Sequence, residues 1–444
     1  MWASKVLKGR NARSITKTSI AAAASAPTSQ AEFSANSQAF SVAVTELLEC
    51  LDFVLDQLDD QGEHGDLLQF HLSRLAKEIS KYENSKVEEQ ISQPWTGYVC
   101  LSQDNRSLLI QSNLGRDRDL LELLLAACRC ACSVYKPDVH PGGDLVPVIS
   151  RTPSITGTVK ATSIWKSKDT NTLFVSIRGT SCKTDHLVNF NRNQKDTASV
   201  FAFPGSDERI FAHSGFLACA ATLLPWLTEE IIRQVTVDKS LKDIVFTGHS
   251  AGGAVAAMIF LHFVCHFPSE LSNAKFSLVT FGAPPVASTN ITELAQGLPQ
   301  TRHIYAVVNE YDLVPRVDQG YITSIISLYR LAYGLPLSDF NNTTFTNNTQ
   351  ADRNQDAIWK LPPPDFYVVG NIIVLRAKLD YNALQSISSQ TSTDTTTTPL
   401  QKLDILRVSP IEFCKLLFFE ISVHKRKVYL NRLEKLVRES GGTV

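Results

Sequence analysis

The chain lacks three features that would assign it to particular classes of protein. No apolar run approaches the roughly 18 residues that a membrane-spanning helix needs, so we expect no transmembrane span. Neither charge is in excess, with 44 acidic residues against 43 lysines and arginines, and we therefore expect no nucleic acid as a partner. The nine cysteines have no regular spacing, which fits a reducing compartment better than a disulfide framework.

The sequence also lacks a metal site. Cys128, Cys130 and Cys132 come closest to a ligand cluster, but a helical stretch would turn Cys130 away from the other two. No second group of cysteines or histidines completes the four ligands of a zinc site. We interpret these cysteines as small core residues and expect no metal.

Residues 1–37 form a basic tail whose role the sequence leaves open. The first acidic residue is Glu32, and the stretch before it is rich in lysine, arginine, serine and alanine. This composition resembles a mitochondrial transit peptide and fits a disordered cytosolic tail equally well. Residues 20–24 are a poor apolar core for a secretory signal. We expect an intracellular protein, with the cytoplasm favoured, the mitochondrion as the alternative, and secretion disfavoured.

Residues 38–115 show helical patterns. Apolar residues recur every three or four positions over 40–58 and again over 68–82, with two glycines between the stretches. This pattern predicts an N-terminal helical hairpin. The hairpin either docks on the main domain or offers a groove to a partner.

Residues 116–444 alternate strands with helices. This order predicts an α/β fold with a mostly parallel sheet that is covered on both faces. The expected strands are 158–165, 172–177, 244–247, 276–281, 304–308 and 365–375, and the expected helices are 117–135, 216–235 and 251–267. Pro225 predicts a kink or break in the second of these helices. The polar tracts near 340–352 and 384–400 predict flexible inserts.

Ser250 stands where a strand must turn sharply into a helix. The segment Gly248-His249-Ser250-Ala251-Gly252 follows one apolar strand and precedes an apolar helix. Such a turn lifts a serine hydroxyl above the sheet edge, and it requires small residues two positions away on either side. Gly248 and Gly252 meet this requirement. The setting predicts a nucleophile elbow with Ser250 as the nucleophile.

An acid and a histidine should follow this serine along the chain. His424 is the one histidine beyond all the candidate acids, whereas His303 precedes them. Asp312 comes just after the strand ending at 308, at the carboxyl edge of the sheet, where it can orient an imidazole. Glu310 and Asp318 are alternatives for the acid. The alternative for His424 is an exposed histidine among basic residues.

Four separated motifs resemble those of the fungal-type, or class 3, lipases of the α/β-hydrolase superfamily. They are 175–180 (VSIRGT), 213–216 (HSGF), 248–253 (GHSAGG) and 280–285 (TFGAPP), and 312–315 (DLVP) resembles the family's acid motif. The resemblance implies an α/β-hydrolase fold. It also implies that Thr180 supplies one oxyanion donor through its backbone N–H, alongside the backbone N–H of Ala251.

The resemblance further implies a serine hydrolase that cleaves ester bonds of lipids, with acylglycerols as the expected substrate. Ser250 would attack the carbonyl carbon, His424 would take the serine proton, and Asp312 would hold the imidazole. This chemistry requires no cofactor. The expected partners are a lipid or ester substrate and, peripherally, a lipid surface. Two alternatives stay open: an esterase for small soluble esters of the feruloyl type, and a catalytically silent binding scaffold.

The chain departs from the class 3 pattern in its lid region and before its histidine. Asp185-His186 stands where the family often has a tryptophan, and the inserts lengthen the stretch between acid and histidine. Residues 189–196 are almost wholly polar and 200–204 are apolar, which predicts a flap that shelters the pocket in water and rests on lipid when open. The alternative is a surface loop whose Phe201 and Phe203 pack on the body.

Overall fold

The computed structural model describes residues 117–136, 140–153, 159–179, 194–205, 208–318, 321, 364–379, 401–414, 418 and 422–441. The basic tail, the helical hairpin and both polar inserts lie outside these residues, and so does Thr180. The predictions made for those segments stay predictions.

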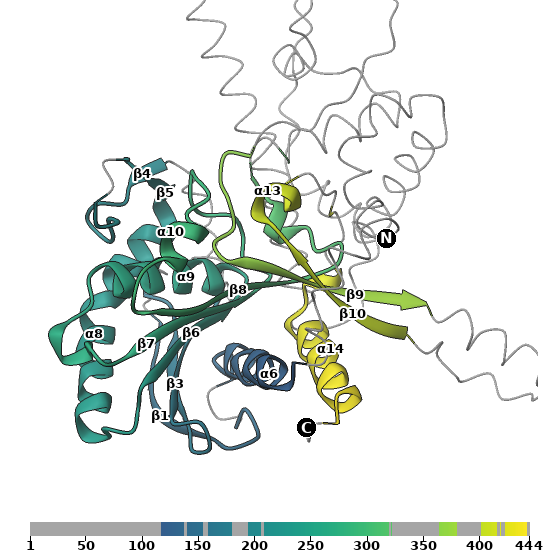
Figure 1. Ribbon diagram of the computed structural model, residues 1–444, viewed down its shortest axis with the longest axis horizontal. Helices are drawn as coiled ribbons and strands as arrows, with labels where there is room; N and C mark the ends of the chain where they lie inside the picture. The colour runs from purple at the N-terminus through teal and green to yellow at the C-terminus, as the bar shows by residue number, and fades with distance from the viewer. Residues whose placement is uncertain are drawn as a thin grey trace, which may run out of the picture. The chain divides into compact units, whose positions relative to one another are not determined.

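An eight-stranded sheet forms the centre of the described region (Figure 1). In spatial order its strands are β1 (Leu145–Arg151), β2 (Thr162–Ser167), β3 (Thr172–Ile177), β6 (Asp243–His249), β7 (Lys275–Phe281), β8 (Thr301–Asn309), β9 (Asn371–Leu379) and β10 (Gln401–Val408). The strands from β3 to β9 are parallel, and β1, β2 and β10 pair antiparallel at the two sides. The predicted α/β class with a mostly parallel sheet is confirmed.

Both edge strands of this sheet were missed by the sequence analysis. β1 is largely half-buried or exposed and contains Pro147 at a register shift, so it carries neither an apolar run nor a clean alternation. β10 follows the Thr-rich tract, and its alternation is broken by adjacent polar residues at 401–402 and adjacent apolar residues at 405–406. The strand expected over 365–375 begins only at Asn371, because Tyr367 makes just an isolated bridge to Ala287.

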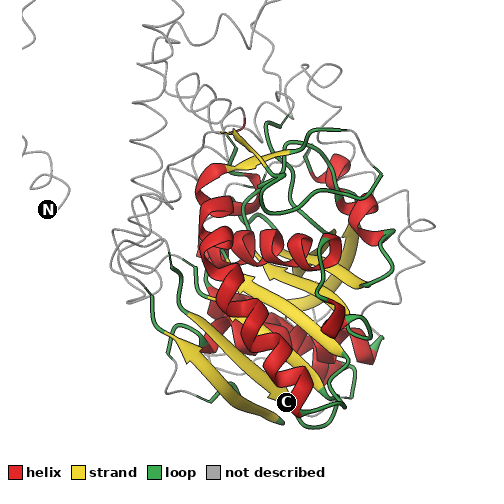
Figure 2. Ribbon diagram, turned by 90° about the vertical axis from the view of Figure 1, so that its left-hand side faces the viewer, coloured by secondary structure: helices red, strands yellow, loops and turns green. Residues whose placement is uncertain are grey.

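Helices cover both faces of the sheet, and this explains why the central strands are rich in apolar residues on both faces. The helices are α6 (Arg118–Ser133), α8 (Ser214–Val237), α9 (Ala251–Cys265), α10 (Thr292–Gln296), α13 (Pro410–Phe413) and α14 (Arg426–Glu439), with short 3-10 turns η2 (Ser269–Leu271), η3 (Val314–Arg316) and η5 (Ser422–His424). α8 and α9 lie on one face, with α6 and α14 on the other (Figure 1). Figure 2 faces the first of these layers, and its helices cross in front of the strands.

The side chains of strand β6 pack alternately in the two core clusters, one on each face of the sheet. Ile244 and Phe246 pack in the core cluster beneath α8 and α9, whereas Val245 packs in the cluster beneath α6 and α14. Successive side chains of a strand point to opposite faces, so a strand covered twice carries apolar residues on both faces. The strand carrying Ser250 is therefore anchored from both sides.

Helix α8 corrects one prediction and qualifies another. The prediction for Pro225 was a kink or a break; the helix runs through Pro225 without interruption, so the break is wrong. By length and composition α8 could cross a membrane, a property that the search for apolar runs did not detect. Leu223, Leu227 and Ile231 of α8 are fully buried in the core cluster, and a core helix passes the same test. The apolar character of α8 is therefore weak evidence for a membrane span.

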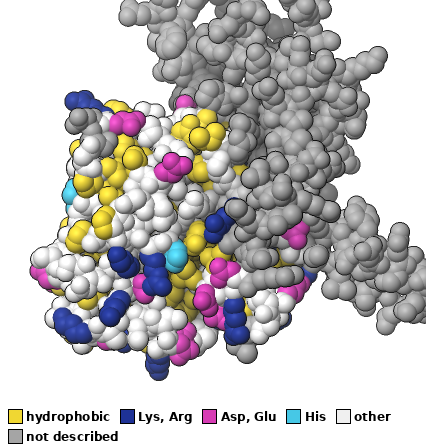
Figure 3. Space-filling view, in the orientation of Figure 1, with side chains coloured by type: hydrophobic (Ala, Val, Ile, Leu, Met, Phe, Trp, Pro, Cys, Tyr) yellow, Lys and Arg dark blue, Asp and Glu magenta, His cyan; other side chains and the backbone are white. Residues whose placement is uncertain are grey.

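The three cysteines of α6 lie in or beside the core. Cys128 and Cys130 are buried and Cys132 is half-buried, in line with small core residues. Burial raises the pKa of the Cys128 and Cys130 thiols well above the usual value, so both stay protonated. On the face of the described region seen in Figure 3, basic and acidic side chains are interspersed. That mixture matches the balanced charge of the sequence.

Candidate active site

Ser250 occupies the turn between β6 and α9. Its backbone has φ 58° and ψ −134°, a strained combination for a residue with a side chain. Its N–H donates to the carbonyl oxygen of Phe281 at 2.9 Å, and its own carbonyl accepts from the N–H of Gly253 at 2.9 Å. These bonds hold the strained turn at the carboxyl end of the parallel strands, where the sequence places the nucleophile.

Backbone crowding explains the small residues around Ser250. A Cβ built on Gly248 would lie 2.5 Å from the carbonyl carbon of Gly252. A Cβ built on Gly252 would lie 2.7 Å from the carbonyl carbon of Arg178. Both neighbours are backbone atoms, which cannot rotate out of the way. The close approach expected of a nucleophile elbow is present at both glycines.

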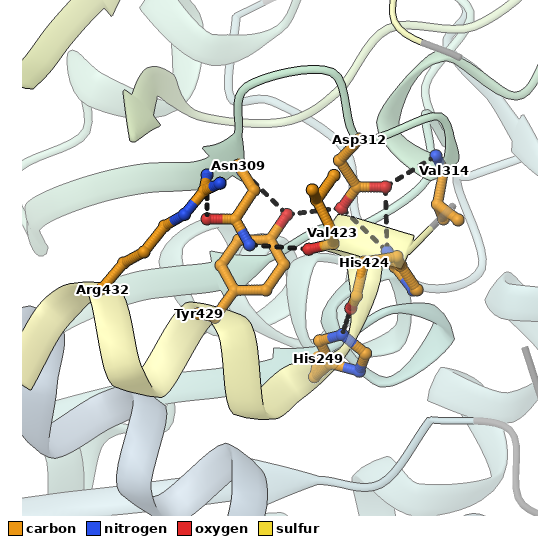
Figure 4. A network of polar contacts seen from close by, with 8 residues as sticks. All are labelled: His249, Asn309, Asp312, Val314, Val423, His424, Tyr429 and Arg432. Atoms are coloured by element: carbon orange, nitrogen blue, oxygen red, sulfur yellow. Dashed lines mark hydrogen bonds and ion pairs between the residues drawn. The ribbon is translucent and has the colours of Figure 1, made fainter. Parts of the chain in front are cut away.

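Asp312 and His424 meet beside this turn. Asp312 follows β8 and is fully buried, and His424 closes η5 and is 2% exposed. Nδ1 of His424 lies 2.8 Å from Oδ2 of Asp312 and 3.0 Å from Oδ1 (Figure 4). A carboxylate only accepts hydrogen bonds, so Nδ1 carries the ring proton. His424 therefore presents Nε2 as its basic nitrogen.

The basic nitrogen of His424 is available. Nε2 is buried and makes no hydrogen bond among the described residues, so the hydroxyl of Ser250 is not bonded to it in this structure. Contacts of this kind often tighten only when substrate binds. Gly282 brings the groups together, because it follows the Phe281 carbonyl that holds Ser250. A Cβ on Gly282 would lie 2.9 Å from Nδ1 of His424.

The buried carboxylate of Asp312 has further donors. The N–H of Val314 donates to Oδ1 at 3.0 Å, and the hydroxyl of Tyr429 donates to Oδ2 at 2.5 Å. The N–H of Asn309 donates to the same hydroxyl at 3.0 Å, which orients it toward Asp312. Burial, and then the charge of Asp312, raise the pKa of Tyr429 well above 10, so this tyrosine remains a donor. A buried charge needs such partners to remain ionised.

The two alternative acids face other groups. Glu310 pairs with Arg376 at 3.2 Å, and Oδ1 of Asp318 accepts from the N–H of Tyr321 at 3.0 Å. The ring nitrogens of His424 bond to neither of them. Among the three candidates the structure brings Asp312 to the histidine. His424 is also buried, which excludes the alternative of an exposed histidine.

One of the two expected oxyanion donors lies in the described region. Ala251 is the first residue of α9, so its N–H has no acceptor within the helix and stands at the positive end of the helix dipole. Thr180 lies outside the described residues, and its role stays a prediction. The preceding residue is held in place, because the N–H of Gly179 donates to the hydroxyl of Tyr135 at 3.0 Å.

Two side chains hold the backbone at His424. Nδ2 of Asn309 donates to the carbonyl oxygen of Val423 at 2.7 Å, and Nε2 of His249 lies 2.6 Å from the carbonyl oxygen of His424 (Figure 4). NH1 of Arg432 donates to Oδ1 of Asn309 at 3.1 Å, which fixes the amide with its nitrogen toward Val423.

Sequence reasoning missed Asn309 and Tyr429. Tyr429 lies on the buried stripe of α14 with Leu433 and Leu436, where an aromatic residue usually indicates core packing. Asn309 is the last residue of a strand, a common place for a turn-forming side chain. Neither position carries a signal for contact with the acid or with the histidine loop. Both contacts arise because α14 packs beside the end of β8.

The apolar part of the predicted flap is core in this structure. Val200, Phe201 and Phe203 are buried in the cluster that α8 and α9 cover. Nδ1 of His262 lies 2.6 Å from the carbonyl oxygen of Val200, which ties this segment to α9. The packing alternative therefore describes these residues. Residues 180–193, where the family's lid would begin, lie outside the described part of the chain.

The arrangement suits nucleophilic acyl transfer. A hydroxyl on a strained turn stands beside a buried imidazole whose other nitrogen is held by a carboxylate. A helix N-terminus at the same turn can stabilise negative charge on an attacked carbonyl oxygen. Among the residues that the structure describes, no group of three histidine, cysteine or acidic side chains could hold a metal ion.

Comparison with known proteins gives a family match. Residues 174–321 match the family described as lipase (class 3), a range that includes Ser250 and Asp312 and ends before His424. Among curated proteins, none matches the chain.

Several solved fungal lipases are similar to part of this chain. A triacylglyceride lipase of Rhizomucor miehei is 21% identical with a TM-score of 0.37, over 45% of this chain and 75% of that one. A triacylglycerol lipase of Penicillium expansum is 18% identical with a TM-score of 0.38, over 45% and 73%. Of the Rhizomucor miehei lipase in complex with its propeptide, the chain covers 61%.

Proposed function

We propose that this chain is a serine hydrolase of lipid esters that cleaves the ester bonds of acylglycerols, because residues 174–321 match the class 3 lipase family. The family supports a lipid ester as the substrate. The acylglycerol class and the residues that act on it are our proposal.

The proposed reaction starts at Ser250. Its oxygen attacks the ester carbonyl carbon while Nε2 of His424 takes the hydroxyl proton, and the tetrahedral oxyanion forms near the N–H of Ala251. Asp312 keeps Nδ1 protonated and stabilises the imidazolium. The proton then passes from His424 to the departing alcohol, which leaves an acyl-enzyme. Water attacks the acyl-enzyme with His424 as base, releasing the fatty acid and restoring the serine.

One observation carries this proposal. The imidazole of His424 is bonded through Nδ1 to Asp312 at 2.8 Å, and its Nε2, beside the strained turn of Ser250, is buried without a partner among the described residues. An unpartnered buried nitrogen is costly, and such groups are typical of catalytic positions. The same observation argues against a catalytically silent scaffold.

The esterase for small soluble esters remains the second candidate. The burial of Phe201 and Phe203 favours it, because the apolar segment expected to meet lipid packs in the core. An activity panel of acylglycerols, phospholipids and soluble aryl esters separates the two candidates. Acylglycerol hydrolysis that rises when the substrate passes its solubility limit supports the lipase. Turnover restricted to dissolved esters supports the esterase.

Labelling of the nucleophile tests the proposal directly. A fluorophosphonate should label the purified protein, and Ser250→Ala should abolish labelling and lower turnover roughly a million-fold. Ser272→Ala, at an exposed serine after η2, is the matched control and should leave both unchanged. Retained labelling in folded Ser250→Ala would contradict the assignment of the nucleophile.

A further inference from the structure

His249 lies between Gly248 and Ser250, and the proposed reaction gives it no role. Its side chain is 3% exposed. Its ring packs on the ring of His424 with centroids 4.5 Å apart, and on the edge of Tyr429 at 5.8 Å. Burying a polar histidine costs free energy, and a large apolar side chain would fill the same space without that cost. Packing alone therefore does not explain a histidine in direct contact with the proposed base.

The hydrogen bond of His249 determines which nitrogen carries its proton. Nε2 lies 2.6 Å from the carbonyl oxygen of His424, and a carbonyl can only accept. Nε2 must therefore be the protonated nitrogen. Nδ1 is buried and has no hydrogen-bond partner in the part of the chain that the structure describes. A proton there would leave an unsatisfied buried N–H, and protonation of both nitrogens would bury a charge. The ring is consequently neutral.

We propose that His249 is a positioning residue whose neutral ring, through its Nε2–H, ties the backbone of His424 to the turn that carries Ser250. Its effect on catalysis rests on the proposed function. Because His249 is joined to Ser250 by one peptide bond, the tether fixes the backbone of His424 relative to that of the nucleophile. Asn309 holds the preceding carbonyl from the end of β8, so the backbone at His424 is held from two strands.

The neutral state of His249 suits its place beside a base. His424 becomes positively charged each time it takes a proton, and a charged neighbour at 4.5 Å would oppose that step. The groups that act on His249 are His424 and Arg426, with Tyr429 also in ring contact. Burial, and then the charge of His424, hold the pKa of His249 well below 6.5, with Arg426 adding to the effect. His249 therefore keeps its tether while His424 gains and loses a proton.

A matched pair of variants tests the tether through kinetics. Glutamine can donate from a position close to that of Nε2, whereas methionine has a similar volume and no donor. On a soluble ester, His249→Met should lower kcat about 10- to 100-fold with KM changed by less than about two-fold, because a misplaced base slows the chemical step. His249→Gln should keep most of the activity. Glutamine no better than methionine, or methionine equal to the unmutated protein, would overturn the proposal.

A second measurement does not depend on hydrolysis. In the full chain labelled with 15N-histidine, NMR should show His249 with Nε2 protonated and Nδ1 unprotonated from about pH 6 to pH 8. His249→Met should broaden or shift the ring signals of His424, and His249→Gln should largely restore them. A charged His249, or the Nδ1–H form, would refute the tether. If the fluorophosphonate failed to label the unmutated protein, the proposed function would fail, and this spectrum would still decide the tether.

Discussion

An alanine at Gly282 should disturb the histidine and the acid together. Gly282 has φ +57°, a left-handed conformation that L side chains rarely adopt. A Cβ there would lie 2.8 Å from Oδ2 of Asp312, and 2.9 Å from both Cε1 and Nδ1 of His424. None of these atoms belongs to a long flexible chain. We therefore expect Gly282→Ala to push the bonded pair away from the turn of Ser250.

Two separate costs set the size of the effect of Gly282→Ala. The left-handed backbone costs about 1–2 kcal/mol for a residue with a Cβ, and crowding of a packed site costs about 1–3 kcal/mol more. The unfolding free energy should therefore fall by about 2–5 kcal/mol. Relief of the contacts requires a shift of roughly half an ångström, and a misplacement of about 1 Å can cost about 100-fold in rate. We expect kcat to fall about 10- to 100-fold.

Two other glycines separate these costs. Gly205 has φ +75° with no atom within 4 Å of an added Cβ, so Gly205→Ala introduces backbone strain without a clash. Gly297 has φ −73°, and the atom nearest to an added Cβ lies 3.5 Å away. Gly297→Ala therefore introduces neither backbone strain nor a clash. Urea unfolding followed by circular dichroism, with kcat on a soluble ester, measures all three variants. If Gly282→Ala lost no more activity than Gly205→Ala, the reasoning about the clash would be refuted.

Three further predictions concern the surroundings of the site. Tyr429→Phe removes a donor from buried Asp312 and the acceptor of the Asn309 N–H, so the unfolding free energy should fall by about 1.5–3 kcal/mol; an unchanged urea midpoint would contradict this. Phe201→Ala should cost about 3–5 kcal/mol as a core truncation, and a stable variant that loses only interfacial activation would restore the lid hypothesis. The pKa of His249 is lower in the folded chain than in the unfolded chain, so the unfolded chain takes up the proton first as the pH falls. The unfolding free energy should therefore fall by at most about 1.4 kcal/mol per pH unit below about pH 6.5. His249→Gln should flatten that part of a stability profile measured by urea unfolding between about pH 7.5 and pH 5.5, and an equal slope would contradict the neutral ring.

Local chain geometry made the strained turn at Ser250 readable from the sequence. An apolar strand, two glycines around Ser250 and an apolar helix are one continuous pattern along the chain, although the backbone that crowds Gly252 comes from residues 177–179, at the end of the neighbouring strand β3. The mostly parallel sheet was readable for a similar reason, since strands covered on both faces carry apolar residues on both faces. The edge strands β1 and β10 were not, because their burial depends on neighbours distant in the sequence.

Chain order by itself proposed Asp312 and His424 as partners but left Glu310 and Asp318 open. Only the tertiary structure shows which of the three carboxylates contacts His424. The chain passes through β9, β10 and η5 before it reaches His424, and the path of these elements brings the imidazole to Asp312. The contact of Tyr429 with the acid, and that of His249 with the histidine backbone, likewise join residues more than a hundred positions apart. Such bonds depend on how α14 packs beside the sheet, and no local pattern of residue types encodes that packing. The burial of Phe201 also could not be predicted from the sequence. An apolar residue in a loop is compatible with an exposed flap or with a packed core, and only its tertiary neighbours distinguish the two.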